Sequence, residues 1–378
     1  MKRILILTEL GDAHAYAVAE AVTRKGGAVT LWHTADFPHC ADETVLFEEG
    51  RWHVRVRGPA LELEDFRFDT VWHRRPTLGL TGDKLHPADR EFALRECRLF
   101  RSSLFGLIAP DAFWVNPPEA VARASRKPLQ HQVAHEVGMA TPDTAYTNDP
   151  DVIRAFLSRR GGQVVYKPLH GVSWRNGDAR WTPYTNVLTE EALVADHLLR
   201  AAPGIYQELL FKDYELRVTV LGHHVLAARI LSQETQNGRV DWRRSYHELR
   251  IEPFTLPPEL AQQCRELLKR LGLVFGCVDF VVTTDGRAVF LEVNESGQFL
   301  FVERYAEIPL LDAFAELLLQ GRPEFLWQEG EHNIRYSEDL VEAVRQMDET
   351  REQLHLPSPD RSIREDVWRN EESFTAPV

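Results

Sequence analysis

Three oxygen-bearing side chains lie near position 290 in two short apolar segments. Asp279 interrupts the apolar run 275–282, and Glu292 and Asn294 alternate with apolar neighbours. Because side chains alternate across a strand, Glu292 and Asn294 project from the same sheet face. Oxygen ligands converging from paired strands are typical of a divalent-cation site, and Mg²⁺ takes one or two carboxylates together with substrate phosphates. The alternative is a solvated sheet face, but a buried, unpaired carboxylate costs several kcal/mol, so we predict that these three residues bind a metal.

The turn between the two segments supports this prediction. Asp285-Gly286 separates the runs 275–282 and 288–293. An Asp-Gly pair suits a type I′ turn, which joins two antiparallel strands. We therefore predict a hairpin that brings the three oxygen-bearing side chains together.

Two lysines are candidates for binding phosphate. The chain has seven lysines among its 44 basic residues, so a lysine in an apolar strand is unusual here. Lys167 ends the apolar run 164–167 and is followed by a polar loop that contains Gly171; an ammonium and glycine amides together can hold nucleotide phosphates. Lys127, directly before Pro128, is the second candidate. A lysine at a strand edge that reaches solvent is the alternative for Lys167. The chain contains neither GxxxxGK[ST] nor GxGxxG, so P-loop and Rossmann binding modes are not supported.

A further polar group follows in the segment 206–217. Gln207, Glu208 and Leu210 stand at the end of one predicted strand, and Glu215 follows in the next. A carboxylate with neighbouring backbone groups suits an adenine edge, and a second carboxylate suits ribose hydroxyls. An ordinary amphipathic strand is the alternative.

Composition excludes several classes of protein. Of the 378 residues 44% are hydrophobic and 27% charged, which is typical of a folded globular chain. The net charge of −13 argues against indiscriminate binding to nucleic acid or to an anionic membrane. No apolar run is long enough to span a membrane, and the four cysteines show no CxxC spacing for a zinc site. We expect a cytoplasmic protein.

The order of predicted elements divides the chain into parts of different class. Strands interleaved with helices over 1–118 predict a mainly parallel α/β sheet. Residues 119–137 form a predicted helix within a second part, 119–203. The third part, 204–321, has the antiparallel pattern of an α+β domain. The last part, 322–378, is charged, and its predicted helix 337–354 is interpreted as a packing helix.

The order of these residues resembles the ATP-grasp superfamily. The resemblance implies an N-terminal pre-ATP-grasp domain (1–118), a central lid domain (119–203), a C-terminal antiparallel α+β domain (204–321) and an extension (322–378). It also implies that ATP and Mg²⁺ bind between the lid and the C-terminal domain. The implied roles are phosphate contacts for Lys127 and Lys167, closure of the loop at Gly171, adenine contacts for Gln207, Glu208 and Leu210, ribose contacts for Glu215, and magnesium ligation by Asp279, Glu292 and Asn294.

Finer motifs resemble the graspetide synthetases, the microviridin-type maturases of ribosomal peptides. These motifs are the segments 71–76, 230–233 with 241–243, and 290–298. The resemblance implies that Asp or Glu side chains of a precursor peptide are activated as acyl phosphates. A Ser/Thr hydroxyl or Lys amine then attacks, which gives ω-ester or ω-amide macrocycles. The chain departs from the family pattern at Glu295, where proline is common, and at His73, where Tyr or Phe is common.

The resemblance also implies partners. The substrate would be a precursor peptide with a leader and a core rich in acidic and hydroxyl residues, and we expect the leader to bind near 174–184. Arg74 and Arg75 are candidates for steering an acidic peptide, with a solvated strand end as the alternative. We also expect a homodimer.

Three arginines, Arg217, Arg229 and Arg243, are candidate catalytic donors to a tetrahedral oxyanion. A salt-bridge role is the alternative for each.

A competing function is an ATP-grasp carboxylate–amine ligase that adds amino acids to a small-molecule or protein carboxylate.

Overall fold

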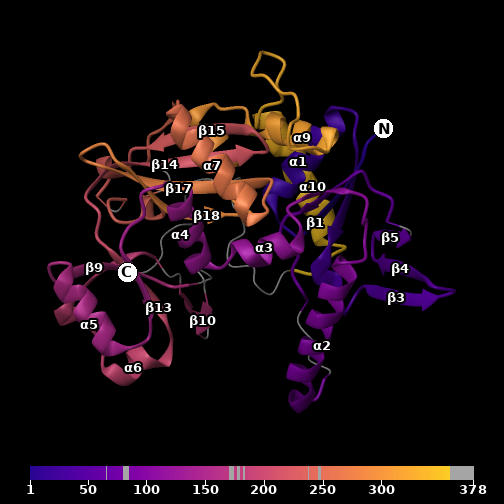
Figure 1. The fold of residues 1–378 in the computed structure, drawn as a ribbon. Helices are drawn as coiled ribbons and strands as arrows, with labels where there is room; N and C mark the ends of the chain where they lie inside the picture. Colours follow the sequence, from indigo (N-terminus) through magenta and orange to yellow (C-terminus); the bar gives the residue numbers. More distant parts are fainter. Residues whose placement is uncertain are drawn as a thin grey trace.

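The computed structural model shows a chain built around several separate sheets (Figure 1). The described residues are 1–64, 66–79, 85–169, 174–176, 179–181, 184–236, 238–245 and 248–357. The mixture of a parallel sheet with antiparallel sheets confirms the predicted α/β and α+β class. None of the helices within these ranges combines the length and apolar character needed to cross a bilayer.

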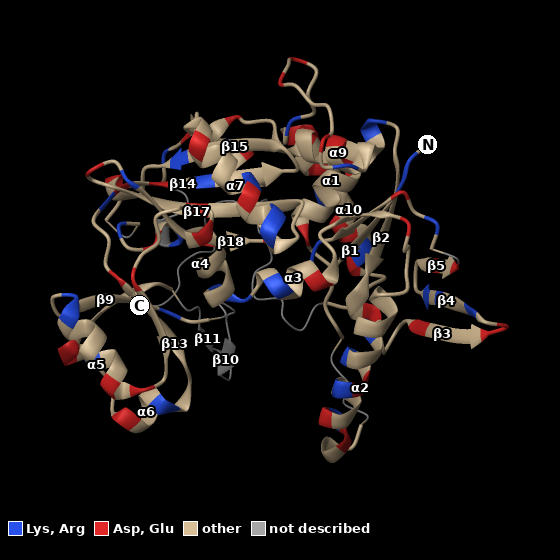
Figure 2. Cartoon of the chain, viewed as in Figure 1, with Lys and Arg blue, Asp and Glu red and all other residues tan. Residues whose placement is uncertain are grey.

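The N-terminal part is a parallel four-stranded sheet in the order β2-β1-β6-β7, as its alternating pattern predicts. Asp12 begins helix α1 by accepting hydrogen bonds from the backbone amides of His14 and Ala15. Helix α2 projects from this part, with basic and acidic residues interspersed along it (Figure 2). The elements are β1 (Arg3–Thr8), α1 (Ala13–Arg24), β2 (Ala28–His33), η1 (Thr34–Asp36), the antiparallel β3 (Asp42–Glu48), β4 (Arg51–Gly58) and β5 (Leu61–Glu64), then β6 (Thr70–His73), α2 (Pro87–Phe105) and β7 (Phe113–Val115).

The helix predicted over 119–137 is in fact two helices, α3 (Pro118–Ala124) and α4 (Lys127–Glu136). The reason is Pro128, because proline has no N–H to bond to the carbonyl of Ala124 and its ring clashes with that carbonyl, so proline fits only in the first turn of a new helix. Helix α4 packs on β18 and α7, and α3 packs on α4 and α7, so that Ala124, Val133 and Ala134 belong to the core of the C-terminal part. The part 119–203, predicted as the lid, thus begins with two helices that pack with the C-terminal part.

The part predicted to be the lid, called the lid below, has its own sheet and its own small core. Its strands are antiparallel in the order β12-β9-β13-β8, and helices α5 and α6 accompany them. Strand β13 belongs to this sheet, so the predicted boundary at 203 falls one strand too early. The elements are β8 (Thr144–Thr147), α5 (Pro150–Arg159), β9 (Gln163–Lys167), the pair β10 (Trp174–Asn176) and β11 (Ala179–Trp181), β12 (Asn186–Thr189), η2 (Glu190–Ala192), α6 (Asp196–Ala201) and β13 (Gly204–Glu208).

The C-terminal part is a five-stranded antiparallel sheet in the order β16-β15-β14-β17-β18. Helices α7 and α4 cover one face of this sheet and share a core with it. Helices α1 and α9 belong to a second core, which also includes buried residues of β14, β15 and β17. The elements are β14 (Lys212–Leu221), β15 (His224–Ile230), η3 (Ser232–Glu234), η4 (Trp242–Ser245), β16 (Ile251–Phe254), α7 (Pro258–Leu271), β17 (Phe275–Thr283), β18 (Ala288–Asn294), α8 (Leu300–Ala306) and α9 (Leu310–Gln320).

The C-terminal extension returns to the N-terminal part. Helix α10 (Glu338–Glu352) packs on α1 and buries Leu340 and Val344, which confirms the predicted packing helix. Beyond it, His355 bonds to Asp36 at 2.7 Å. The described part of the extension, 322–357, thus packs with the folded core.

Candidate active site

Strands β14, β17 and β18 place three predicted site residues in one row. Arg217 lies opposite Asp279, and Asp279 lies opposite Glu292; Asn294 is paired with Cys277, two residues along the same face. Gly286 at the turn has φ +84°, which suits the predicted Asp-Gly hairpin. The register shifts directly after Asp279, and such bulges are frequent beside active sites.

Asp279 is held by Arg217. The Nη1 atom of Arg217 donates to both carboxylate oxygens, at 2.9 and 2.8 Å, and its Nη2 donates to the carbonyl of Gln298 at 2.8 Å. Burial raises the pKa of Asp279, and Arg217 opposes that change. Burial likewise disfavours the charge of Arg217, but Asp279 raises its pKa above the usual value. The salt-bridge alternative therefore describes the contacts of Arg217.

Glu292 is held by Lys127, the first residue of α4, with Nζ 2.5 Å from Oε2. Burial acts to raise the pKa of Glu292, but the charge and hydrogen bond of Lys127, together with the other cations near it, outweigh burial and the pKa falls to about 2. Two more cations, Lys167 and Arg243, act in the same direction. Glu292 is therefore an ionised carboxylate that cations from three different elements approach.

Lys167 reaches the site from lid strand β9. Its Nζ donates to Oε1 of Gln207 at 2.9 Å, and Nε2 of Gln207 donates to Thr144 at 3.0 Å. Burial lowers the pKa of Lys167, while Glu292 and Glu215 oppose that change. The structure thus brings the predicted phosphate-binding lysines toward the same carboxylate.

Arg243 lies on η4, in a loop connected to the lid. Asp241 accepts from Nε of Arg243 at 2.8 Å and from Nη2 at 2.5 Å, and it also accepts from the backbone amide of Thr185 at 3.1 Å. Burial disfavours the charge of Arg243, but Asp241 raises its pKa, with Glu292 and Asp279 contributing. Arg243 is therefore a charged group facing the row of site residues.

The predicted nucleoside contacts lie where the lid meets the C-terminal sheet. Glu208 ends β13 and accepts from the amide of Asp143 at 3.2 Å, and Leu210 follows in the connection to β14. Glu215 is buried and bonds to Lys212 at 2.5 Å. Burial raises the pKa of Glu215, and Lys212 opposes this.

The prediction of a catalytic role for Arg229 is wrong. Arg229 lies opposite Leu216, whose side chain belongs to the core under α7, so Arg229 points to the face away from Asp279. It bonds there to Glu252 at 2.5 Å and stacks over Tyr214.

The prediction of a peptide-steering role for Arg74 is also wrong. Arg74 is 0% exposed, and it bonds to Asp12 and to the carbonyl of Ser296. Its neighbour Arg75 is half-buried, and its predicted role stays a prediction. Gly171 and much of the region 174–184 lie outside the described residues.

Tyr146 lies near enough to Glu292 to feel its charge, and the sequence reasoning did not single it out. It lies on lid strand β8, its ring centroid 6.5 Å from that of His131, which is one turn after Lys127 on α4. Burial, and secondly the charge of Glu292, raise the pKa of Tyr146 to about 12. Nothing distinguishes this tyrosine from an ordinary strand residue in the sequence.

The donor set restricts which metal could bind. No group of three or more His, Cys, Asp or Glu side chains is arranged to hold a metal within the described ranges. Two carboxylates and the Asn294 amide are available instead, all oxygen donors. Such a set fits Mg²⁺, which completes its shell with water and phosphate oxygens.

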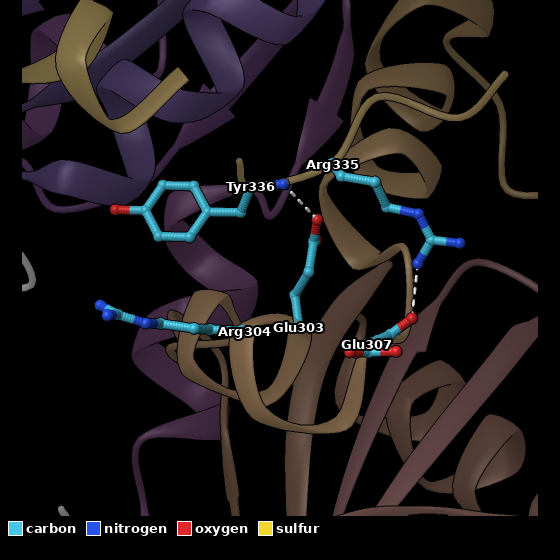
Figure 3. A pocket seen from close by; sticks show the side chains of 5 residues that line it. All are labelled: Glu303, Arg304, Glu307, Arg335 and Tyr336. Carbon is cyan, nitrogen blue, oxygen red and sulfur yellow. Dashed lines mark hydrogen bonds between the residues drawn. The ribbon is translucent and has the colours of Figure 1, made fainter. Parts of the chain in front are cut away.

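A separate pocket of about 310 Å³ lies between α8 and the extension (Figure 3). Its lining includes Glu303, which accepts from the amide of Tyr336 at 2.7 Å, and Arg335, which donates to the carbonyl of Glu307 at 2.5 Å. The residues that line it include none of the predicted site residues that the structure describes.

Comparison with solved structures identifies similar proteins. A RiPP-associated ATP-grasp ligase from Chryseobacterium gregarium, in complex with ADP and a leader and core peptide, is 26% identical with a TM-score of 0.75; the match covers 85% of this chain and 97% of that one. Macrocyclase MdnC from Microcystis aeruginosa, bound with precursor peptide MdnA, is 28% identical with a TM-score of 0.73, covering 85% of this chain and all of MdnC. Macrocyclase MdnB from the same organism is 30% identical with a TM-score of 0.72, covering 84% of this chain and 99% of MdnB.

Curated relatives match a smaller part. A probable alpha-L-glutamate ligase from Teredinibacter turnerae is 27% identical over 193 residues, which are 49% of this chain, and the match spans 60% of the relative's length. No protein-family model matches the chain. The identity to MdnB over almost all of that macrocyclase decides the family: the chain belongs to the ATP-grasp ligases of the graspetide synthetase type.

Proposed function

We propose that the protein is an ATP-dependent macrocyclase of a ribosomal precursor peptide. It would activate Asp or Glu side chains of the peptide and join them to Ser/Thr hydroxyls or Lys amines. The observation that carries the proposal is the convergence of Lys127, Lys167 and Arg243 on the row Asp279–Glu292, at the junction of lid and sheet. The solved relatives support the same substrate class, because they include a ligase in complex with a leader and core peptide and a macrocyclase bound with its precursor peptide.

The nucleotide would bind between lid and sheet, with Glu208, Gln207 and Leu210 at the adenine and Glu215 at the ribose. Asp279, Glu292 and Asn294 would hold Mg²⁺, which neutralises charge on the phosphates. Lys127 and Lys167 would then bind phosphate oxygens. Lys127 already donates to Glu292 and Lys167 to Gln207. When the nucleotide binds, each lysine would exchange that acceptor for a phosphate oxygen.

The chemistry has two steps. A peptide carboxylate oxygen attacks the γ-phosphorus of ATP, and ADP leaves. The hydroxyl or amine attacks the acyl carbon of the resulting acyl phosphate, loses its proton, and phosphate leaves. We propose Arg243 as the donor to the oxyanion of the second step. Arg229 faces away, and Arg217 is buried with both terminal nitrogens bonded to Asp279 and Gln298, whereas Arg243, although paired with Asp241, is 51% exposed.

The test is incubation with ATP, Mg²⁺ and a short peptide encoded beside the gene that is rich in Thr, Ser, Glu and Asp. Loss of one water per link, with fragmentation showing rings, is the expected result. At an ATP concentration below the KM of the unchanged protein, Lys167→Met should form product at least about ten-fold more slowly. The proposal is contradicted if the protein hydrolyses ATP but leaves every such peptide unmodified.

A second candidate is a carboxylate–amine ligase that adds amino acids, favoured by the match to probable alpha-L-glutamate ligases. It predicts a gain of amino-acid mass when glutamate is supplied.

The domain roles (pre-ATP-grasp, lid, ATP-grasp), a homodimer and a cytoplasmic location are also part of the proposal; light scattering of the purified protein checks the dimer.

A further inference from the structure

The loop that follows β18, residues 295–300, is held by a buried ion pair of the N-terminal part. Arg74 donates from Nη1 to the carbonyl of Ser296 and from Nε to Asp12 at 3.0 Å. Both side chains of the ion pair are 0% exposed. Since Asp12 is also the residue that begins α1, Arg74 is fixed at one end and bonds to the loop with the other.

Two more side chains of the N-terminal part hold the same loop. His14 accepts from the amides of Phe299 and Leu300 through Nε2, at 2.9 and 3.1 Å. Asn116 donates to the carbonyl of Glu295 at 2.9 Å. We call Arg74, His14 and Asn116 the clamp.

The clamped loop is bonded to the candidate metal site at two points. The amide of Ser296 donates to Oδ1 of Asn294 at 3.1 Å, and the carbonyl of Gln298 accepts from Arg217 at 2.8 Å. Gly297 approaches Cys277 so closely that a Cβ would lie 2.5 Å from its side chain. The loop therefore has little freedom to move without displacing both contacts.

We infer that the clamp positions the metal-binding end of the site. Arg74 binds the carbonyl of Ser296 while the amide of the same residue orients Asn294, which leaves the second lone pair of Oδ1 for a cation. The same loop, through Gln298, holds the arginine that orients Asp279. The clamp residues are positioning residues: they act on the metal through the loop. This inference rests on the proposed function, in which Asn294 is a magnesium ligand.

The test measures Mn²⁺ binding to the ADP-bound protein, with Mn²⁺ as the probe for the magnesium site. His14→Leu removes the acceptor for two amides, whereas His14→Gln keeps an acceptor oxygen at the same reach. Arg74→Lys keeps a cation for Asp12 but cannot also reach Ser296. Arg101→Lys is the matched control, because Arg101 forms a buried pair with Glu43 in the same part of the chain without touching the loop.

We expect His14→Leu and Arg74→Lys to weaken Mn²⁺ binding about ten-fold or more. His14→Gln should stay close to the unchanged protein, as should Arg101→Lys, and binding of metal-free ADP should be the same in all four variants. Mn²⁺ affinity unchanged in both His14→Leu and Arg74→Lys, or equal losses in His14→Leu and His14→Gln, would overturn the inference.

Two further measurements keep the result decisive. If His14→Leu does not fold, hydrogen exchange of amides 295–300 is compared in Arg74→Lys and Arg101→Lys; faster exchange in Arg74→Lys alone supports the clamp, and equal exchange overturns it. Asn294→Ala must abolish Mn²⁺ binding. If the unchanged protein binds no Mn²⁺ with ADP, or Asn294→Ala binds it normally, the proposed site fails rather than the clamp.

Discussion

Replacing Glu292 with glutamine tests the site in two ways. The substitution should strengthen the binding of metal-free ADP and should slow turnover in the presence of Mg²⁺. The substitution keeps the shape of the side chain but removes one negative charge and one metal ligand. Its partner Lys127 lies 2.5 Å away, and the two side chains are 41% and 25% exposed. Lys127 then faces the nucleotide site without its carboxylate, together with Lys167 and Arg243.

The exposure of the pair sets the magnitude. Unit charges about 4 Å apart interact by about 4 kcal/mol near a protein surface, and screening of a partly exposed pair reduces the net effect to about 1 kcal/mol. Without Mg²⁺, ADP should therefore bind about five-fold more tightly to Glu292→Gln, because three cations are less neutralised. With Mg²⁺, turnover should fall at least about a hundred-fold, since a metal ligand is lost.

The assays are calorimetric ADP titration in EDTA and phosphate release with ATP, Mg²⁺ and precursor peptide. Glu266→Gln is the matched control, because Glu266 forms a partly exposed ion pair with Arg270 on α7, with Glu266 36% exposed, and it is not among the predicted site residues. It should change neither quantity. The reasoning is refuted if Glu292→Gln weakens metal-free ADP binding, or if its turnover stays within about ten-fold of the unchanged protein.

Three other substitutions test separate parts of the molecule. Lys167→Met should raise the KM for ATP roughly 10- to 100-fold, because a charge-assisted hydrogen bond to phosphate is lost; initial rates against ATP measure this, and an unchanged KM contradicts it. Arg229→Ala should leave turnover unchanged and lower the free energy of unfolding by less than about 1 kcal/mol, as urea unfolding will show; loss of activity would place Arg229 in the site after all. Burial raises the pKa of Glu303 from 4.5 to about 7, although two backbone amides oppose this. The stabilisation from neutral Glu303 is therefore complete below pH 4.5 and is lost as the pH rises through 7. Over that range the free energy of unfolding should fall by up to about 3 kcal/mol more in the unchanged protein than in Glu303→Gln. Parallel pH profiles of the two proteins would contradict this.

The parts of the site that could be predicted depend on local rules. The Asp-Gly turn and the alternation over 291–294 were enough to predict the hairpin, and its pairing confirms it, whereas the bulge directly after Asp279 was not predicted. The fold class and the family are confirmed as well. All of these features need only a few neighbouring residues, or the order of motifs along the chain.

The errors arose where a side chain's position depends on distant residues. Strand β15 reads Ala227, Ala228, Arg229, Ile230 without alternation, so the face of Arg229 follows only from its pairing with β14. Arg74 follows an apolar strand and has the pattern of an exposed strand end. Its partner Asp12 is 62 residues away, and no local pattern indicates that contact.

The pairing of charges explains how the site stays stable without its ligands. An unpaired charge in a partly buried site is costly, whereas a paired one is tolerated. Each predicted carboxylate on the sheet face has its own cation, and the arginine from the lid-connected loop has its own carboxylate. The pairs are Lys127–Glu292, Arg217–Asp279, Lys212–Glu215 and Arg243–Asp241. A metal–nucleotide complex carries both signs, so the cation can take over Glu292 while the phosphates take over Lys127. Because that exchange leaves no charge unpaired, the arrangement favours binding of metal and nucleotide together over binding of the metal alone.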